Sequence, residues 1–548
     1  MSGFRVFLIF GFCFFLFSWL LPNHVPPFST GYQDFLAFYA LLVLGARFRL
    51  FLRLDYRFAV VFLIGFIPVL QWFHGKVIFW GDACLAAAYL FFFGLALVVS
   101  SGLEEVRSRE RFALVFFAFL VLASVVSVWI SLRQWLVLSG GLWEAELPLN
   151  GRPFANIGQP NNLATLLSMG FVGVLYFYEK GKLGCLTFGV LLFWLLLGIA
   201  LTQSRTPWVV LPMMLLFWSL KHRYGLRLTK FRFAAIVGGY FCLAVLLPML
   251  SSSLLLSTTN ITDRFGSLER LSLWWQLLHA VLEGPTWGYG WNQISVAQVN
   301  ISLAYPVPLM TEHSHNILLD LLLWNGPVIG GAIILFLGSW LVSVLWRSRS
   351  IESVCALMAA CSVLIHGMLE FPLEYAYLLL PTGLLLGLAI SEDSAARVIK
   401  VPMCFQYGAV CVLAALISWS FVEYRVMEED FRKMRFETAG IGHVDSSQVT
   451  PSVMVFTQLR EFIRFARTPA VEGMNEAEIE WMRKVAHRYP YPPSLFRYSI
   501  ALGLNGHIVE AREQLSILRA LHGEEHYTEA LQSIEQMSKR YPQLRAVH

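Results

Sequence analysis

The hydrophobic positions of this chain gather into long runs that recur through its first three quarters. About thirteen of these runs approach the ~20 residues that a helix needs to cross a bilayer. The pattern predicts an all-α, polytopic transmembrane helical bundle over residues 1–421. The runs lie near residues 4–21, 34–48, 58–73, 82–99, 113–135, 163–178, 184–201, 206–220, 233–250, 316–346, 352–368, 373–390 and 404–421.

The basic residues between these runs orient the bundle. Loops on the cytoplasmic side of a membrane protein carry the excess of lysine and arginine. Alternating the spans from a cytoplasmic N-terminus places every basic cluster inside, and the outer side then receives residues 136–162, 202–205, 251–315 and 367–372 and the tail after residue 421. The basic clusters stand at 47–57, 107–111, 180–182, 221–230 and 347–349.

The last segment, residues 422–548, is charged and helix-prone. Helical periodicity is clear in stretches such as 477–486, and two similar segments end in Arg-Tyr-Pro, at 488–490 and 540–542. Their spacing does not match the ~34-residue period of tetratricopeptide arrays. We therefore expect a soluble helical domain, with a tetratricopeptide-like array and a plain helical bundle as equal alternatives.

Composition supports a membrane protein. The 548 residues are 57% hydrophobic and 14% charged, whereas soluble domains have about 25% charged residues. The net charge of +5 is small, and the basic residues stand in short clusters between the apolar runs. Such clusters are typical of a protein surrounded by membrane lipid, where they set the topology, and they are poor evidence for nucleic-acid binding. The eight cysteines lie in or beside apolar runs, without metal-ligand spacing. Trp287 and Trp291 are interpreted as side chains at the membrane interface.

An outer segment rich in glycine, proline and amide side chains precedes the sixth span. It reads Gly-Arg-Pro-Phe-Ala-Asn-Ile-Gly-Gln-Pro-Asn-Asn over residues 151–162. Side-chain amides donate and accept hydrogen bonds without charge, which suits sugar hydroxyls and phosphate oxygens. A well-turned, capped loop is the alternative, but a helix cap needs one asparagine and the run has three. The candidates to bind substrate or support this loop are Arg152, Asn156, Gln159, Asn161 and Asn162.

Two arginines stand where the outer side meets the membrane. Arg205 ends the turn Thr-Gln-Ser-Arg between two apolar spans, and an unpaired arginine at mid-membrane costs about 2.5–3.5 kcal/mol. Its planar guanidinium matches a pair of phosphate oxygens, although snorkelling to the interface explains the position equally well. Arg270 begins an amphipathic segment that predicts a helix along the membrane surface. The apolar face of that segment carries Leu273, Leu277 and Leu278.

The strongest feature for chemistry is Glu-His-Ser-His-Asn at 312–316, which opens the tenth span. A histidine at the start of a membrane helix can serve as a general base near neutral pH. A metal pair is disfavoured because histidines two residues apart do not share a helix face, and a plain surface pair is the alternative. The next outer turn has a histidine and acids beside an apolar span, where they need partners. The candidates are Glu312, His313, His315, Asn316, His366 and Glu370.

Four of these segments together resemble the bacterial protein O-oligosaccharyltransferases, the pilin-glycosylating branch of the O-antigen ligase and polymerase superfamily. They are the run 151–162, the turn 202–205, the motif 312–316 and His-Gly-Met-Leu-Glu-Phe-Pro-Leu at 366–373. The resemblance extends from about residue 20 through the last span. One departure stands in the tenth span. The superfamily carries Gly-x-x-Gly there, whereas this chain has one more residue between the glycines, Gly326-Pro-Val-Ile-Gly330.

The resemblance implies a GT-C-like glycosyltransferase domain at 1–421 with a large periplasmic loop at 251–315 and a periplasmic tail at 422–548, in a bacterial inner membrane. The implied donor is an undecaprenyl-diphosphate-linked oligosaccharide, and the implied acceptor is a serine or threonine of a secreted, pilin-like protein. His315 would then be the base, and Arg205 and Arg270 would clamp the diphosphate in an inverting displacement. The resemblance implies no cofactor and no metal.

Three rival functions are compatible with parts of the pattern. An O-antigen ligase would use lipid A core sugars as acceptor, but the Gln-Pro-Asn run and the sizeable tail favour a protein. A lipid or polysaccharide transporter should show inverted repeats or broken helices at mid-membrane, and no convincing pair is evident. A structural scaffold would leave the outer arginines and histidines without purpose.

Overall fold

The computed structural model describes most of the chain. Part of the predicted outer loop, residues 254–268, lies outside the described residues. The description also leaves out residues 1, 48–50, 54–55, 104, 139, 147–150, 393–397, 442–449 and 548.

Every predicted apolar run falls on a helix. Six helices are long and apolar enough to cross a membrane (α3, α4, α5, α9, α13 and α16), and α1, α2, α7, α14 and α15 are shorter apolar helices. The prediction of a polytopic helical membrane protein is confirmed, while the number of spans and their orientation stay predictions. The helices are α1 Ser2–Leu20, α2 Gly31–Arg47, α3 Tyr56–Phe73, α4 Trp80–Ser101, α5 Val106–Trp135, α6 Pro160–Glu179, α7 Cys185–Leu201, α8 Thr206–Lys221, α9 Lys230–Ser253, α13 Ile317–Arg347, α14 Ile351–His366, α15 Ala376–Ile390 and α16 Met403–Thr438.

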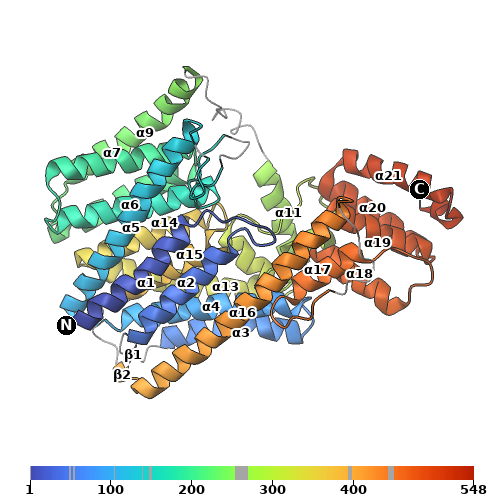
Figure 1. Cartoon of the computed structure of the whole chain (residues 1–548), viewed down its shortest axis with the longest axis horizontal. Helices are drawn as coiled ribbons and strands as arrows, with labels where there is room; N and C mark the ends of the chain where they lie inside the picture. Colours follow the sequence, from blue (N-terminus) through green and yellow to red (C-terminus); the bar gives the residue numbers. More distant parts are fainter. Residues whose placement is uncertain are drawn as a thin grey trace. The chain divides into compact units, whose positions relative to one another are not determined.

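The chain forms two compact units, and the first contains residues 1–63, 89–266 and 338–419. Within it α1 packs on α2 and α5, and α6 packs on α5, α7 and α14 (Figure 1). Its buried aromatic core includes Phe12, whose ring lies edge-on to Phe112 and Phe116 at centroid distances of 5.5 and 5.3 Å. Gly170 lets α6 approach α5 closely, since a Cβ there would lie 2.1 Å from the Ser124 hydroxyl.

A short antiparallel ribbon is one element that the hydrophobic pattern does not predict. Strand β1 (Phe51–Arg53) pairs with β2 (Val398–Lys400), with Phe51 opposite Lys400. Each strand has three residues, which is too short for a period-two alternation to stand out beside membrane spans.

The second unit contains residues 64–88, 267–337 and 420–548. Its helix α13 is broken at Gly326. Gly326 adopts φ 75° and ψ 169° inside α13, which leaves carbonyls without their helical partners. The Leu323 carbonyl accepts a hydrogen bond from the Tyr289 amide at 2.8 Å, and the Trp324 carbonyl accepts from the Gln71 side chain at 2.9 Å. The turn before α12 (Ile294–Ile301) and Gln71 of α3 therefore supply hydrogen-bond donors to the carbonyls at the break, as apolar surroundings require.

Replacing Gly326 by alanine should destabilise the protein. The left-handed backbone costs an alanine about 1–2 kcal/mol, and the new Cβ would lie 2.0 Å from the Thr286 carbonyl oxygen. Gly331→Ala in the same helix is the control, because nothing lies within 4 Å of its Cβ position and alanine favours a helix by roughly 0.5–1 kcal/mol. Thermal melting in detergent should show a fall for Gly326→Ala and none for Gly331→Ala. Equal melting temperatures would contradict the described break.

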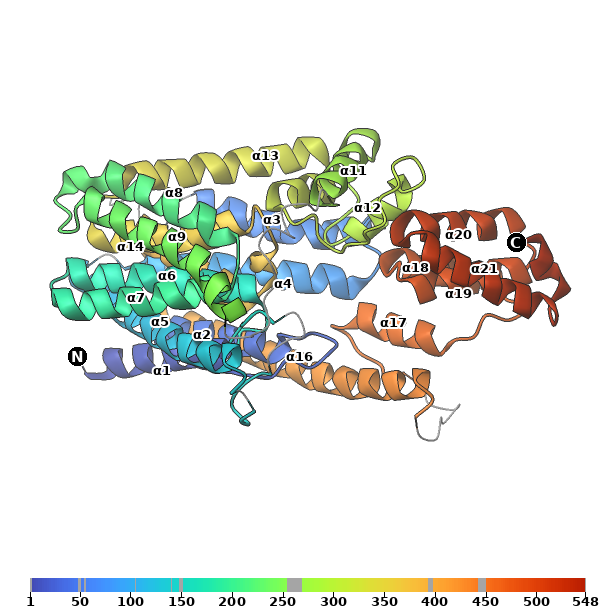
Figure 2. The ribbon, with the colours of Figure 1, turned by 90° about the horizontal axis from the view of Figure 1, so that it is seen from above.

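The tail is a set of helices that pack in sequence. Helix α16 is continuous across residue 422, where the sequence predicts the soluble part to begin. From α18 to α21 each helix packs on the next (Figure 2), and the 3-10 turn η3 (Pro542–Ala546) follows. This sequential packing is compatible with stacked hairpins and with a bundle, so both alternatives stay predictions. The helices are α17 Thr457–Arg467, α18 Glu476–Arg488, α19 Pro492–Leu504, α20 Ile508–His522 and α21 Glu524–Ser538.

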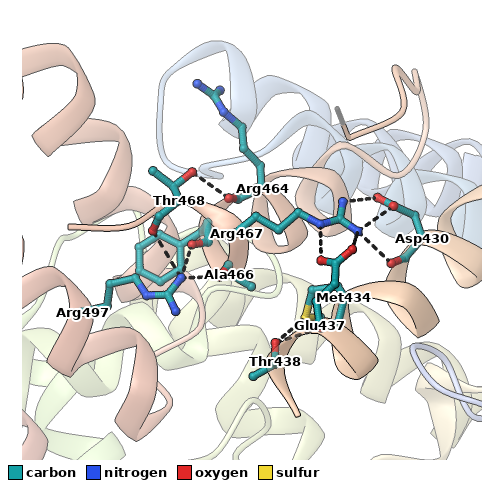
Figure 3. A network of polar contacts seen from close by, with 10 residues as sticks. Asp430, Met434, Glu437, Thr438, Arg464, Ala466, Arg467, Thr468 and Arg497 are labelled. Carbon is teal, nitrogen blue, oxygen red and sulfur yellow. Dashed lines mark hydrogen bonds and ion pairs between the residues drawn. The ribbon is translucent and has the colours of Figure 1, made fainter. Parts of the chain in front are cut away.

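Two arginines fasten α17 to its neighbours (Figure 3). Arg467 pairs with Asp430 at 2.9 Å and with Glu437 at 2.7 Å, both on α16. Arg497 of α19 donates to backbone carbonyls at the end of α17, including that of Phe465. The buried core of the tail also takes in Phe79 and Val299 from outside the tail, so residues 422–548 do not close their hydrophobic core by themselves.

Candidate active site

Hydrogen bonds join three of the predicted motifs in the first unit. Arg152 donates through Nε to the Thr202 carbonyl at 3.1 Å and through Nη2 to Asn161 Oδ1 at 3.2 Å. Asn161 in turn donates through Nδ2 to Glu370 Oε1 at 3.2 Å. The run 151–162, the turn 202–205 and the turn after α14 are thus brought together, although they are far apart in sequence. The side chain of Asn161 thus connects the Glu370 carboxylate to the Arg152 guanidinium.

Buried amides hold the run 151–162 in place. Gln134 Oε1 accepts from the amides of Phe154 and Ala155 at 3.1 and 2.8 Å. Asn156 is buried, and its amide group bonds to the backbone of Leu20, Trp143 and Ala145. Asn156 is therefore a supporting residue of the loop, with its amide engaged inside the fold.

Asn162 and His366 are also buried supports. Asn162 Nδ2 donates to the Tyr377 hydroxyl at 2.9 Å, and His366 Nδ1 lies 2.8 Å from the Thr165 hydroxyl. Arg152, Gln159 and Asn161 are partly exposed, which leaves these three side chains as the members of the run that a substrate could reach.

Arg205 is exposed at the N-terminus of α8. It borders a hollow that Gln203, Trp208 and Tyr240 also line. The turn before it is ordered: Gln203 adopts φ 50°, and the Ser204 and Thr206 amides donate to the hydroxyls of Thr202 and Ser204. A guanidinium at the positive end of a helix is well suited to an anionic group such as phosphate.

Helix α11 (Glu269–Glu283) carries Arg270 in its first turn and is amphipathic as predicted. Leu273 and Leu277 are buried, but Leu278 is 40% exposed. Adjacent helical positions are about 100° apart, so Leu278 turns away from the face that Leu277 shares with Leu273. Arg270 itself is exposed.

The motif 312–316 forms a fixed turn at the start of α13. Asn316 Oδ1 accepts from the amides of Leu318 and Leu319, which caps the helix. The buried Ser314 donates its amide to Asp320 at 2.9 Å, and its carbonyl accepts from the Trp274 indole of α11 at 2.8 Å. Within the second unit the helix of Arg270 and the turn of His315 are therefore fastened to each other.

His315 has a left-handed backbone, with φ 57°. Residues other than glycine are uncommon in this region, and such strain persists where the surroundings over-determine it. Both neighbours of His315 are held in place. Ser314 is bonded to Asp320 and to Trp274, and Asn316 caps α13. The half-buried imidazole is thereby presented in a defined direction.

Two models of known protein families match the parts of the chain that carry most of these candidate residues. Residues 190–336 match the O-antigen ligase family model, and residues 354–535 match a model described as the C-terminal part of virulence factor membrane-bound polymerase. The first match contains Arg205, Arg270 and His315, and the second contains His366, Glu370 and most of the tail.

Two relatives with similar sequences show the family to which the chain belongs. The chain is 30% identical over 533 residues to a general O-oligosaccharyltransferase of Acinetobacter baylyi, covering 94% of this chain and 92% of the relative. It belongs to the O-oligosaccharyltransferases of the O-antigen ligase family. A second relative, the ComP-specific O-oligosaccharyltransferase of the same organism, is 28% identical over 391 residues, covering 69% of this chain and 70% of that protein.

The resemblance drawn from the motifs is confirmed. This oligosaccharyltransferase is a multi-pass membrane glycosyltransferase that transfers an oligosaccharide to proteins, so the transporter and the scaffold are set aside. Among the described residues, no three His, Cys, Asp or Glu side chains gather as a metal-binding group.

The structure of the oligosaccharyltransferase adds two residues that sequence reasoning missed. Arg488 of α18 and Tyr491 contact Glu312, at 3.5 and 2.6 Å. Burial alone would raise the pKa of the Glu312 carboxyl, but the Arg488 charge and the Tyr491 hydrogen bond outweigh it, so that pKa lies below its usual range. Arg488 stands in the first Arg-Tyr-Pro segment, the one signal in the sequence that marked it.

The surroundings of His313, Trp287 and Trp291 can be compared with what the sequence predicts for them. Desolvation lowers the pKa of His313 to about 4, because the attraction of Glu312 does not compensate for it. Trp287 is 57% exposed, and its interpretation as an interfacial side chain stays a prediction. The interface interpretation is wrong for Trp291, which is buried and stacks on Trp324 at 4.7 Å, since the break in α13 draws its turn into the core.

Proposed function

We propose that the protein transfers a preassembled oligosaccharide from undecaprenyl diphosphate to a serine or threonine of a pilin-like protein in the periplasm. The acceptor class and the donor lipid rest on the motifs that resemble the pilin-glycosylating branch. The anchored turn that presents His315 is the observation that carries the mechanism.

His315 acts as the general base in this proposal. The acceptor hydroxyl oxygen attacks the anomeric carbon, its proton passes to the imidazole, and the bond from that carbon to the diphosphate oxygen breaks. The electron pair leaves with undecaprenyl diphosphate, and a single displacement inverts the anomeric configuration. General-base catalysis of this kind contributes about 10²–10⁴-fold.

Arg205 and Arg270 bind the diphosphate in this proposal. Both guanidiniums are exposed in or directly before the first turn of a helix, where the helix dipole also favours an anion. The leaving diphosphate gains negative charge as the bond breaks, and fixed cations stabilise that charge. Two arginines can supply this stabilisation without a metal ion.

Purified enzyme tests this proposal with undecaprenyl-diphosphate oligosaccharide as donor and a pilin-like protein as acceptor. Mass spectrometry should find the glycan on a serine or threonine, and NMR of the product should show inverted configuration relative to the donor. Retained configuration would replace the single displacement by a double one. A parallel reaction with lipid A core should give no product, and product there alone would make the protein an O-antigen ligase.

Chelator treatment should leave the transfer rate unchanged. The reason is that the proposed mechanism assigns charge neutralisation to arginines and proton transfer to His315. The rate is compared with and without EDTA, and after adding back Mg²⁺ or Mn²⁺. Activity that falls with EDTA and returns with the ion would overturn the metal-independent mechanism.

A further inference from the structure

Arg488 is a buried cation of the tail that contacts the histidine motif, residues 312–316. Its side chain is 7% exposed, and its Nε and Nη2 donate to the two carboxylate oxygens of Asp82, each at 3.0 Å. Its Nη1 lies 3.5 Å from Glu312 Oε2. A buried guanidinium is tolerated only when paired in this way, so the pairing with Asp82 and Glu312 is part of the fold.

The second oxygen of the Glu312 carboxylate is held by the tail as well. The Tyr491 hydroxyl donates to Oε1 at 2.6 Å, and Tyr491 directly precedes α19. In addition the Ser295 hydroxyl of α12 donates to the backbone carbonyl of Arg488 at 2.7 Å. The end of α18 and the start of α19 therefore hold the histidine motif and the helix that precedes it.

The second Arg-Tyr-Pro segment offers an internal comparison. Arg540 is exposed, and its guanidinium lies over its neighbour Tyr541 at 5.4 Å. An Arg-Tyr-Pro segment that ends a tail helix thus folds with its arginine at the surface. The burial of Arg488 is explained by its partners Asp82 and Glu312, and not by the local sequence pattern.

We propose that Arg488 and Tyr491 are positioning residues for the transfer reaction, which hold Glu312 and through it the turn that presents His315. Glu312 lies three residues before His315, on the side opposite the cap formed by Asn316. The left-handed backbone of His315 persists because residues on both sides of it are held. On the N-terminal side Asp320 and Trp274 hold Ser314, and the tail adds a further contact through Glu312. This inference rests on the proposed role of His315.

Thr311, the residue directly before the motif 312–316, ties the same turn to α12 and α11. The Thr311 hydroxyl donates to the His313 carbonyl at 2.6 Å, and the Thr311 amide donates to Gln298 of α12 at 2.8 Å. Gln298 donates in turn to Gln276 of α11 at 2.9 Å. The turn is thus connected on one side to the tail through Glu312 and on the other to the helix of Arg270.

Tyr491→Phe is the test, because it removes one hydroxyl and keeps the ring that packs near Phe462. We expect kcat to fall about tenfold, because the Glu312 carboxylate loses one hydrogen bond and the turn of His315 is held less firmly, while KM for the lipid-linked donor stays unchanged. The melting temperature should fall only slightly. In a Glu312→Gln background the same substitution should have little further effect, because the two residues act through one contact. If the contact had a purely structural role, Tyr491→Phe would lower the melting temperature and leave kcat unchanged in both backgrounds.

Tyr541→Phe also removes one tyrosine hydroxyl from the tail, in the second Arg-Tyr-Pro segment, and serves as the control that should leave kcat unchanged. A wild-type kcat for Tyr491→Phe, or an undiminished effect in the Glu312→Gln background, would overturn the positioning role. If His315→Asn abolishes transfer while Tyr491→Phe has no effect, only this inference fails. If His315→Asn is active, the proposed base fails first, so the two failures are distinguishable.

Discussion

Replacing His315 by alanine should lower the transfer rate by about 10²–10⁴-fold, the usual contribution of a general base. The acceptor hydroxyl would then have to lose its proton to water while it attacks. Single-turnover measurements with saturating donor and acceptor isolate this chemical step. Binding of the lipid-linked donor should be retained, because the role proposed for His315 is proton transfer alone.

His315→Asn makes this prediction sharper. Asparagine tolerates the left-handed backbone about as well as histidine does, so the turn is kept while the basic nitrogen is lost. We expect the same loss of rate as for alanine. The exposed His526, which pairs with Glu529 on α21, is the control, and His526→Ala should have wild-type activity. An active His315→Asn enzyme would show that the position needs a backbone conformation and not a base.

Arg205→Ala should lower kcat by about 10²–10³-fold, as does removal of one fixed donor to a developing anion. Arg205→Lys should lose nearly as much, because a lysine keeps the charge but cannot pair with two phosphate oxygens at once. The rate with each variant is compared with that of Arg223→Ala, a basic residue in the 3-10 turn η1 (His222–Tyr224) after α8. A mild effect of lysine would reduce the requirement to charge alone.

Arg270 offers the same comparison on a different helix. Arg270→Ala and Arg270→Lys should follow the order predicted for Arg205, since both guanidiniums are assigned to the diphosphate. Substrate titrations separate a loss of donor binding, seen as a higher KM, from a loss of transition-state stabilisation, seen as a lower kcat. A variant of Arg270 with unchanged kcat and KM would remove this arginine from the site.

The helices of this protein could be predicted because membrane spans are long and continuously apolar. Many of their boundaries agree with the structure within a few residues, as for the run 206–220 and helix α8 (Thr206–Lys221). Two helices extend further than their runs: α5 begins at Val106 and α16 continues to Thr438, because charged residues extend both helices beyond the apolar stretch. The ribbon of β1 and β2 could not be predicted, because three residues give no periodicity. Leu278 was placed on the wrong face, because it lies one position from Leu277 and i+1 neighbours diverge on a helix.

The candidate site was predictable in its residue types and less so in its contacts. Arg152, Asn161 and Glu370 were singled out separately, but the hydrogen bonds among them join positions up to 209 residues apart, which no local pattern encodes. The contact of Arg488 with Glu312, 176 residues away, was missed for the same reason. The left-handed backbone of His315 also had no sequence signal, since histidine adopts it only occasionally.

The two glycines that flank the extra residue, Gly326 and Gly330, both stand where the backbone packs closely. Gly326 is where α13 breaks, and its amide lies so near Gly288 that a Cβ on Gly288 would be 2.4 Å from it. Gly330 lies in the helix that restarts after the break, and a Cβ on Gly330 would be 2.5 Å from the Leu321 carbonyl oxygen. Both glycines are therefore set by close backbone packing.

The shared hydrophobic core of the tail limits how glycosylation enzymes of this type can be recombined. A chimera cut at residue 422 would strip Phe79 and Val299 of their partners and would leave Asp82 facing a foreign helix end. Exchange of the helical tail between relatives therefore calls for a graft that also moves the short segments around residues 79–82 and 295–312.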